Sequence, residues 1–187
     1  MILAGDFITH DIAAFPELAD RLGHLKAKQA VFAILGNHDH WHYDPMIETL
    51  FSESGIRLLR NEAAIFDHFA LAGIESNWGG APDLPGALAE VPTDMPVILG
   101  WHEPDNFDLY EDPRIALQVS GHTHGGQVCA PLWGPIQLPS HGNKYARGHF
   151  QRDRSHLFVT RGIGVSEVPF RFLCRPEIPI LSFQPNS

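Results

Sequence analysis

Four short apolar runs, each ending abruptly in a turn of glycine and polar residues, constrain this chain most. The runs cover residues 1–4, 30–35, 97–99 and 115–119. None of them alternates apolar with polar residues, which is typical of strands buried on both faces. Because such strands need covering structure on both sides, the pattern favours a layered α/β sandwich.

Helical and hairpin patterns fill the intervals between these runs, and neither a linker nor a repeat interrupts them. We therefore expect one domain over residues 1–187. The predicted helices cover residues 12–27 and 46–53, the predicted hairpin pairs residues 63–66 with 69–72, and late strands are expected at residues 157–160, 170–173 and 178–183.

Composition excludes some classes of protein. The formal net charge is -9, which argues against a binder of duplex nucleic acid because such a protein needs a basic face. No apolar run approaches the roughly 20 residues needed to span a bilayer, although contact between a surface patch and a membrane stays open.

Cys129 and Cys174 lie far apart and predict two free, buried thiols. We expect a cytoplasmic protein, with membrane association left open.

The twelve histidines are many for 187 residues, and several follow the apolar runs directly. Turns at the carboxyl ends of neighbouring strands meet at one edge of a sheet, where ligands collect. Nitrogen and oxygen donors in one place suit Mn, Fe or Zn better than Ca or Mg. The side chains expected to gather around one point are Asp6, Asn37, His38, His102, His122 and His124.

Each of these turns also has a purely structural interpretation. A Gly-Asp turn after a strand is common, and a lone histidine such as His102 is more often a packed or surface residue. The stretch from Gly121 to Gly126 is harder to explain, because two histidines at i and i+2 between glycines have little structural purpose. Four tryptophans lie near these turns, either as an apolar rim for a leaving group or as packing: Trp41, Trp78, Trp101 and Trp133.

The motifs together resemble the calcineurin-like metallophosphoesterases, in particular the bacterial branch of YkuE- and YaeI-like phosphodiesterases, which includes UDP-2,3-diacylglucosamine pyrophosphatases. This resemblance implies a four-layer α-β-β-α sandwich. The matching segments are Gly5-Asp6, Gly36-Asn37-His38-Asp39, His102-Glu103-Pro104-Asp105, Ser120 to Gln127, Tyr145 to Gly148, Thr160 to Gly164 and Arg171 to Glu177.

The resemblance also implies a role for each site residue. Asp6 would bridge two divalent metal ions (Mn, Zn or Fe). Asn37, His102 and His122 would complete the second metal site, and His124 would bind the first. His38 would contact the scissile phosphate and protonate the leaving oxygen, with Asp39 orienting its ring. The implied reaction is hydrolysis of a phosphodiester or pyrophosphate bond by metal-activated hydroxide. The implied substrate is a small phosphodiester or a lipid-linked pyrophosphate; the oligomeric state is not implied.

One departure from the family pattern affects the expected activity. The family's Asp-x-His motif, on an earlier strand, is absent before Asp6, so we expect a chain truncated at its N-terminus that lacks its first strand or strands. The first metal site would then keep only Asp6 and His124. The alternative interpretation is a catalytically weak or inactive remnant that binds one metal ion or none.

Overall fold

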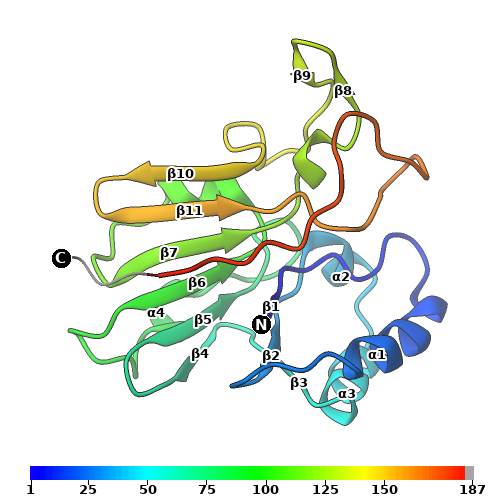
Figure 1. The fold of residues 1–187 in the computed structure, drawn as a ribbon. Coiled ribbons are helices and arrows are strands. Elements are labelled where there is room, and N and C mark those ends of the chain that lie inside the picture. The colour runs from blue at the N-terminus through cyan, green and yellow to red at the C-terminus, as the bar shows by residue number, and fades with distance from the viewer. Residues whose placement is uncertain (184–187) are drawn as a thin grey trace.

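A computed structural model describes residues 1–183 of the chain (Figure 1). Helices and strands alternate in its first half, and strands predominate later. The elements in order are β1 (Ile2–Leu3), η1 (Ile12–Ala14), α1 (Phe15–Gly23), β2 (Val31–Ala33), α2 (Asn37–Trp41), α3 (Met46–Glu53), β3 (Ile56–Leu58), β4 (Glu62–Ile65), β5 (Ala70–Ile74), α4 (Leu84–Ala87), β6 (Val97–Trp101), η2 (Pro104–Asp108), β7 (Ile115–Ser120), η3 (His124–Gly126), β8 (Cys129–Ala130), β9 (Gly134–Pro135), β10 (Gly148–Arg152) and β11 (Ser155–Val159).

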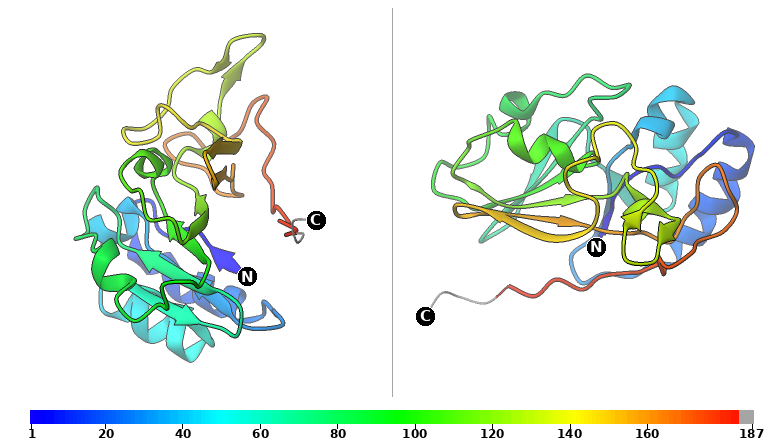
Figure 2. Two further views of the ribbon diagram at one scale, coloured as in Figure 1. Left: turned by 90° about the vertical axis from the view of Figure 1, so that its left-hand side faces the viewer. Right: turned by 90° about the horizontal axis from the view of Figure 1, so that it is seen from above.

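A small parallel sheet, ordered β1-β2-β3, carries α1 and α3 on its outer face (Figures 1 and 2). Successive side chains of a strand point to opposite faces of the sheet. In β2, Val31 and Ala33 pack against the helices with Phe15 and Phe51, whereas Phe32 points to the opposite face. Both faces are therefore buried, which explains why the sequence of β2 is apolar without alternation.

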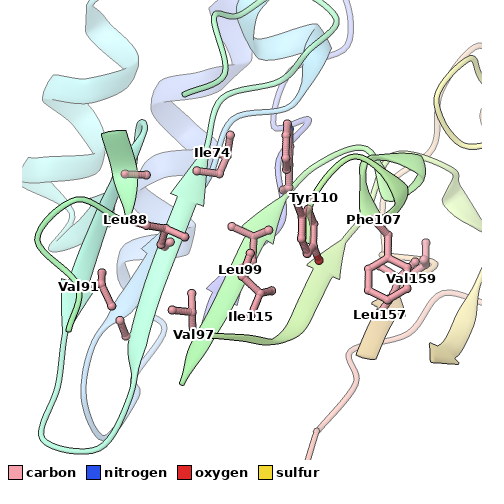
Figure 3. Close-up of a cluster of buried hydrophobic side chains, with 14 residues drawn as sticks. Ile74, Leu88, Val91, Val97, Leu99, Phe107, Tyr110, Ile115, Leu157 and Val159 are labelled. Carbon is pink, nitrogen blue, oxygen red and sulfur yellow. The ribbon is translucent and has the colours of Figure 1, made fainter. Parts of the chain in front are cut away.

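The large sheet has six strands in the order β10-β11-β7-β6-β5-β4. Its four central strands, β11, β7, β6 and β5, run parallel to one another. The edge strands β10 and β4 each form an antiparallel hairpin with the central strand beside them. On its outer face Leu88 and Val91 after α4 pack with Leu99 and Ile115 of the sheet, and Phe107 of η2 packs with Leu157 (Figure 3). This cluster is the largest of the three hydrophobic clusters in the described residues.

The two sheets face each other through a third cluster. Phe32 and Ile34 of the small-sheet side meet Leu59, Ala64 and Leu71 there. The order of layers is helix, sheet, sheet, helix, as the four-layer sandwich requires. The prediction of a mixed α/β sandwich is confirmed.

Several local predictions are confirmed and others are wrong. The helix at 46–53, the hairpin around residues 63–72 and the strand near 157–160 form as expected. The first helix is shorter than residues 12–27, because it starts as η1 and ends at Gly23.

Residues 170–173 and 178–183 form no strand in the part of the chain that the structure describes, apart from one bridge between Val128 and Phe172. Ile178 and Ile180 are exposed, and a β-prone segment without a neighbouring strand leaves its backbone unpaired. No helix within residues 1–183 is long and apolar enough to span a membrane.

Candidate active site and metal centre

The predicted ligand turns meet where the carboxyl ends of both sheets lie together. Asp6 follows β1 and Asn37 follows β2, which are neighbours in the small sheet. His102 follows β6 and His122 follows β7, which are neighbours in the large sheet. Each sheet therefore supplies two side chains, and the face-to-face packing of the sheets sets the distance between the pairs.

Asp6, His102 and His122 form one compact cluster. One ligand atom from each residue lies within 4.8 Å of the other two, and within residues 1–183 this is the one group of three or more His, Cys, Asp or Glu side chains placed to hold a metal ion. Nε2 of His102 is 3.0 Å from Oδ2 of Asp6, and Nδ1 of His102 donates to the carbonyl oxygen of Ala4 at 2.6 Å. That second contact turns Nε2 of His102 toward the carboxylate.

The charges of this cluster are strongly coupled. Burial opposes ionisation of Asp6, but the neighbouring His102, His38 and His122 lower the pKa of Asp6 to about 2. Burial also opposes the charge on His102, and Asp6 outweighs it and raises the pKa of His102 to about 9. Burial, followed by the charge of His102, lowers the pKa of His122 to about 3. A carboxylate and a neutral imidazole, the forms that bind metals, are therefore available in Asp6 and His122.

Two buried polar atoms without partners make the cluster fit a cation. Oδ1 of Asn37 and Nδ1 of His122 have no hydrogen-bond partner within the described residues, although both are buried. Nε2 of His122 faces the carbonyl of Ser140 at 2.7 Å, so Nδ1 carries the lone pair. Unpaired buried acceptors are costly, and a metal ion is one kind of partner that would satisfy either of them.

Glycine is required at two positions where the Asp6 turn and the Asn37 turn approach each other closely. Gly36 has no room for a side chain, because an added Cβ would lie 2.1 Å from Oδ1 of Asp6 and 2.7 Å from Cε1 of His102. At Gly5, φ is +90°, and an added Cβ would lie 2.6 Å from the backbone nitrogen of Gly36. The glycines therefore let the Asp6 and Asn37 turns touch.

Comparison of this sequence with known proteins shows the family to which the chain belongs. The profile described as calcineurin-like phosphoesterase matches residues 1–126. The metallophosphoesterase YkuE of Bacillus subtilis is 33% identical over 98% of this chain and 67% of its own length. The phosphodiesterase YaeI of Escherichia coli is 31% identical over 97% of this chain and 68% of its own length. A Helicobacter pylori metallophosphoesterase is 27% identical over the whole chain, which spans 51% of that protein.

This chain belongs to the calcineurin-like phosphoesterase family. It is accordingly a metal-dependent hydrolase of phosphoric ester bonds. The resemblance inferred from the sequence motifs is confirmed, and the cluster of Asp6, His102 and His122 is the group in this metallophosphoesterase that could hold a metal ion.

Asp39 has a different position from the one expected for it. Its carboxylate accepts hydrogen bonds from the backbone N–H groups of Asp6, Phe7, Ile8 and Gly36, at 2.7 to 3.1 Å. Within residues 1–183 it makes no hydrogen bond to His38. Burial, followed by the charge of Asp6, raises the pKa of Asp39 to about 7. Asp39 therefore ties the Asp6 turn to the start of α2 and does not orient the His38 ring.

A backbone carbonyl orients His38 instead. Nδ1 of His38 lies 3.0 Å from the carbonyl oxygen of Thr9, and the backbone N–H of His38 donates to Oδ1 of Asp6 at 3.0 Å. The carbonyls of Thr9, Ala4 and Ser140 thus hold the rings of His38, His102 and His122 respectively. Sequence analysis missed all three, because every residue type carries the same carbonyl.

His124 is not part of the compact cluster within the described residues. It lies on η3, where its Nδ1 is 3.0 Å from Oε1 of Gln127 and burial lowers its pKa. Side chains from the end of the chain hold its backbone: Arg171 donates to the His124 carbonyl at 2.9 Å, and the thiol of Cys174 donates to it at 3.2 Å. Cys129 and Cys174 are free and buried, as the sequence predicted.

An aromatic rim borders the cluster. The ring of Trp41 lies 4.8 Å from that of His38 and 4.8 Å from that of Trp78, between ring centroids. The ring of Trp78 lies 6.0 Å from that of His122. Trp41 is nearly half exposed. Trp41 therefore lies beside His38, and Trp78 lies beside His122.

Proposed function

We propose that this site hydrolyses a phosphodiester or pyrophosphate bond with two divalent cations. The single observation that carries the proposal is the cluster of Asp6, His102 and His122, in which both histidines are buried and Nδ1 of His122 has no partner among the described residues. These three residues and Asn37 would hold one cation, and their mixed donors suit Mn, Fe or Zn. Bound cations of this kind neutralise phosphoryl charge and lower the pKa of water.

His38 is the residue we assign to the leaving group. Its Nδ1 is occupied by the Thr9 carbonyl, so Nε2 is the atom that would meet the substrate. A protonated ring would stabilise charge on the phosphate and then donate the Nε2 proton to the departing oxygen. The Thr9 carbonyl accepts from the Nδ1–H of this ring and so keeps Nε2 free for the substrate.

The second cation is assigned to Asp6 and His124, with Asp6 bridging the two ions. Two ligands hold a transition metal weakly, and His124 lies outside the compact cluster of the described residues. That geometry favours one rival, a chain that binds a single cation in the cluster and turns over slowly or not at all.

The substrate we propose is a small phosphodiester or a lipid-linked pyrophosphate. The name of the relative YaeI, a phosphodiesterase, supports the diester. The rim of Trp41 and Trp78 supports a substrate with an apolar or planar group next to the scissile bond. A lipid-linked substrate also requires peripheral contact with a membrane.

Metal content and turnover, measured together, test the proposal. The purified chain should take up two equivalents of Mn²⁺ or Zn²⁺ and hydrolyse bis(p-nitrophenyl) phosphate. His122→Ala should lower kcat/KM by at least about 100-fold and remove the cluster's cation. The exposed His68 provides the matched control, because His68→Ala leaves the cluster intact.

Two results would decide against it. Turnover that survives in His122→Ala would show that the cluster is not the active site. One equivalent of metal or less, without turnover, would establish the single-cation rival.

A further inference from the structure

The β8–β9 hairpin exposes large apolar side chains well away from the core. Leu132 is fully exposed, Trp133 is 89% exposed and Ile136 is 68% exposed. Figure 1 shows this hairpin projecting beyond both sheets, and the left view of Figure 2 shows it at the far end of the molecule. Pro131 and Pro135 flank the tip and restrict its backbone, which lowers the conformational entropy that the tip loses on binding.

A neighbouring segment extends the apolar area. Val128 bridges to Phe172, the Cys129 N–H donates to the Phe172 carbonyl at 2.9 Å, and the Phe172 N–H donates to the Gln127 carbonyl at 3.0 Å. Phe170, Phe172 and Leu173 are each more than half exposed. The apolar hairpin surface is defined here by Leu132, Trp133, Ile136, Phe170, Phe172 and Leu173.

Charge separates this part of the chain from the rest. Residues 1–120 contain six Lys or Arg and 19 Asp or Glu, a formal charge of -13. Residues 121–187 contain seven Lys or Arg and three Asp or Glu, a formal charge of +4. No acidic residue occurs between Asp112 and Asp153, the stretch that includes the whole hairpin. The apolar hairpin surface therefore belongs to the basic third of an acidic protein.

We propose that the apolar hairpin surface docks on an anionic lipid bilayer. Tryptophan and leucine at a protruding tip suit the boundary between headgroups and acyl chains, and a basic surround attracts anionic headgroups. A single exposed apolar residue needs no explanation, whereas several large apolar side chains exposed on two segments joined by backbone contacts mark an interaction site. The charge favours the lipid surface over a symmetric, patch-to-patch dimer of this chain, because the two basic regions would then face each other.

The position of the surface links it to the active site. An added Cβ on Gly126 of η3 would lie 2.4 Å from Cβ of Pro135 in β9, so the hairpin packs directly on the loop that carries His124. Gln127, which contacts the ring of His124, also accepts from the N–H of Phe172. Docking would therefore place the site beside the membrane. The lipid-linked part of the proposed function rests on this contact, but the contact itself requires no turnover.

Vesicle binding measures the contact directly. The full chain is sedimented with vesicles of phosphatidylcholine, with and without phosphatidylglycerol. We expect binding to the anionic vesicles, a blue shift of Trp133 emission, and weaker binding when salt shortens the Debye length from about 10 Å to about 3 Å. Leu132→Ser/Trp133→Ser should weaken binding by about 100-fold or more, from the lost apolar burial.

A matched double variant controls for apolar surface in general. Ile65 and Leu109 are exposed at isolated positions outside the apolar hairpin surface, and Ile65→Ser/Leu109→Ser should bind vesicles like the unmodified chain. Leu132→Ser/Trp133→Ser should keep its hydrolysis of the soluble diester, which separates failure of docking from failure of the proposed reaction.

Three results would overturn the docking proposal. The first is an unmodified chain that binds neither kind of vesicle. The second is a control variant that loses binding as strongly as the hairpin variant. The third is a dimer, seen by light scattering, that becomes a monomer in Leu132→Ser/Trp133→Ser and leaves no binding to vesicles; it would assign the surface to self-association.

Discussion

The two histidines of the His122-Thr123-His124 sequence stand in regions built in different ways. His122 follows β7 directly, and packing of the two sheets brings it to Asp6 and His102. His124 lies two residues later, on η3. Its backbone carbonyl accepts hydrogen bonds from Arg171 and Cys174, which come about fifty residues later in the chain. The cluster around His122 therefore depends on the core, whereas the position of His124 depends on side-chain contacts at the rim.

The comparison implies that substitutions can disrupt the cluster around His122 and the η3 loop around His124 independently of each other. A change between the sheets should abolish the cluster and lower the stability of the fold together. A change in the contacts around η3 should loosen His124 and leave the cluster of Asp6, His102 and His122 in place.

The largest effect is expected from Gly36→Ala. The added Cβ would lie 2.1 Å from Oδ1 of Asp6, so the Asp6 and Asn37 turns must separate. We expect the free energy of unfolding to fall by about 3 kcal/mol and the cluster's cation to be lost. Urea denaturation and metal analysis measure the two effects. Gly164→Ala is the control, since nothing lies within 4 Å of its added Cβ; equal effects in both variants would contradict the packing argument.

A smaller effect is expected from Asp39→Asn. In the native protein both carboxylate oxygens of Asp39 accept from backbone N–H groups. Asparagine keeps only one acceptor oxygen, and its NH₂ group would face backbone N–H donors that then have no acceptor. The free energy of unfolding should fall by about 2 kcal/mol, with weaker metal binding. Asp11→Asn, at an exposed helix start, serves as the control. If Asp39→Asn lowers kcat while stability and metal binding stay unchanged, Asp39 acts on His38 after all.

The smallest effect is expected from Arg171→Ala. Removing the guanidinium frees the His124 carbonyl but touches no residue of the cluster. Stability should fall by about 1 kcal/mol, and titration should show a weakened second cation with the first unchanged. Arg175→Ala, an exposed neighbour, should change neither. Loss of both cations in Arg171→Ala would mean that the two regions are not independent.

Prediction from sequence succeeded where local pattern decides structure. The four apolar runs correspond to β1, β2, β6 and β7, and the helix at 46–53 has the predicted bounds. It failed at residues 178–183, where β-prone residues have no strand beside them in the described chain. The sequence also predicted that Asp39 orients the His38 ring. Adjacency in sequence does not reveal that the Asp39 carboxylate instead accepts from the backbone N–H groups of residues 6–8.

The sequence by itself determined the layered class of fold, the family, and the side chains that can carry the chemistry. These follow from residue type and short spacing, which are local properties. The tertiary structure decided which nitrogen of each histidine is free, because carbonyls of Ala4, Thr9 and Ser140 reach the rings from distant positions. It also decided that His122 joins the cluster and His124 does not, since that depends on how two sheets and a late segment pack together.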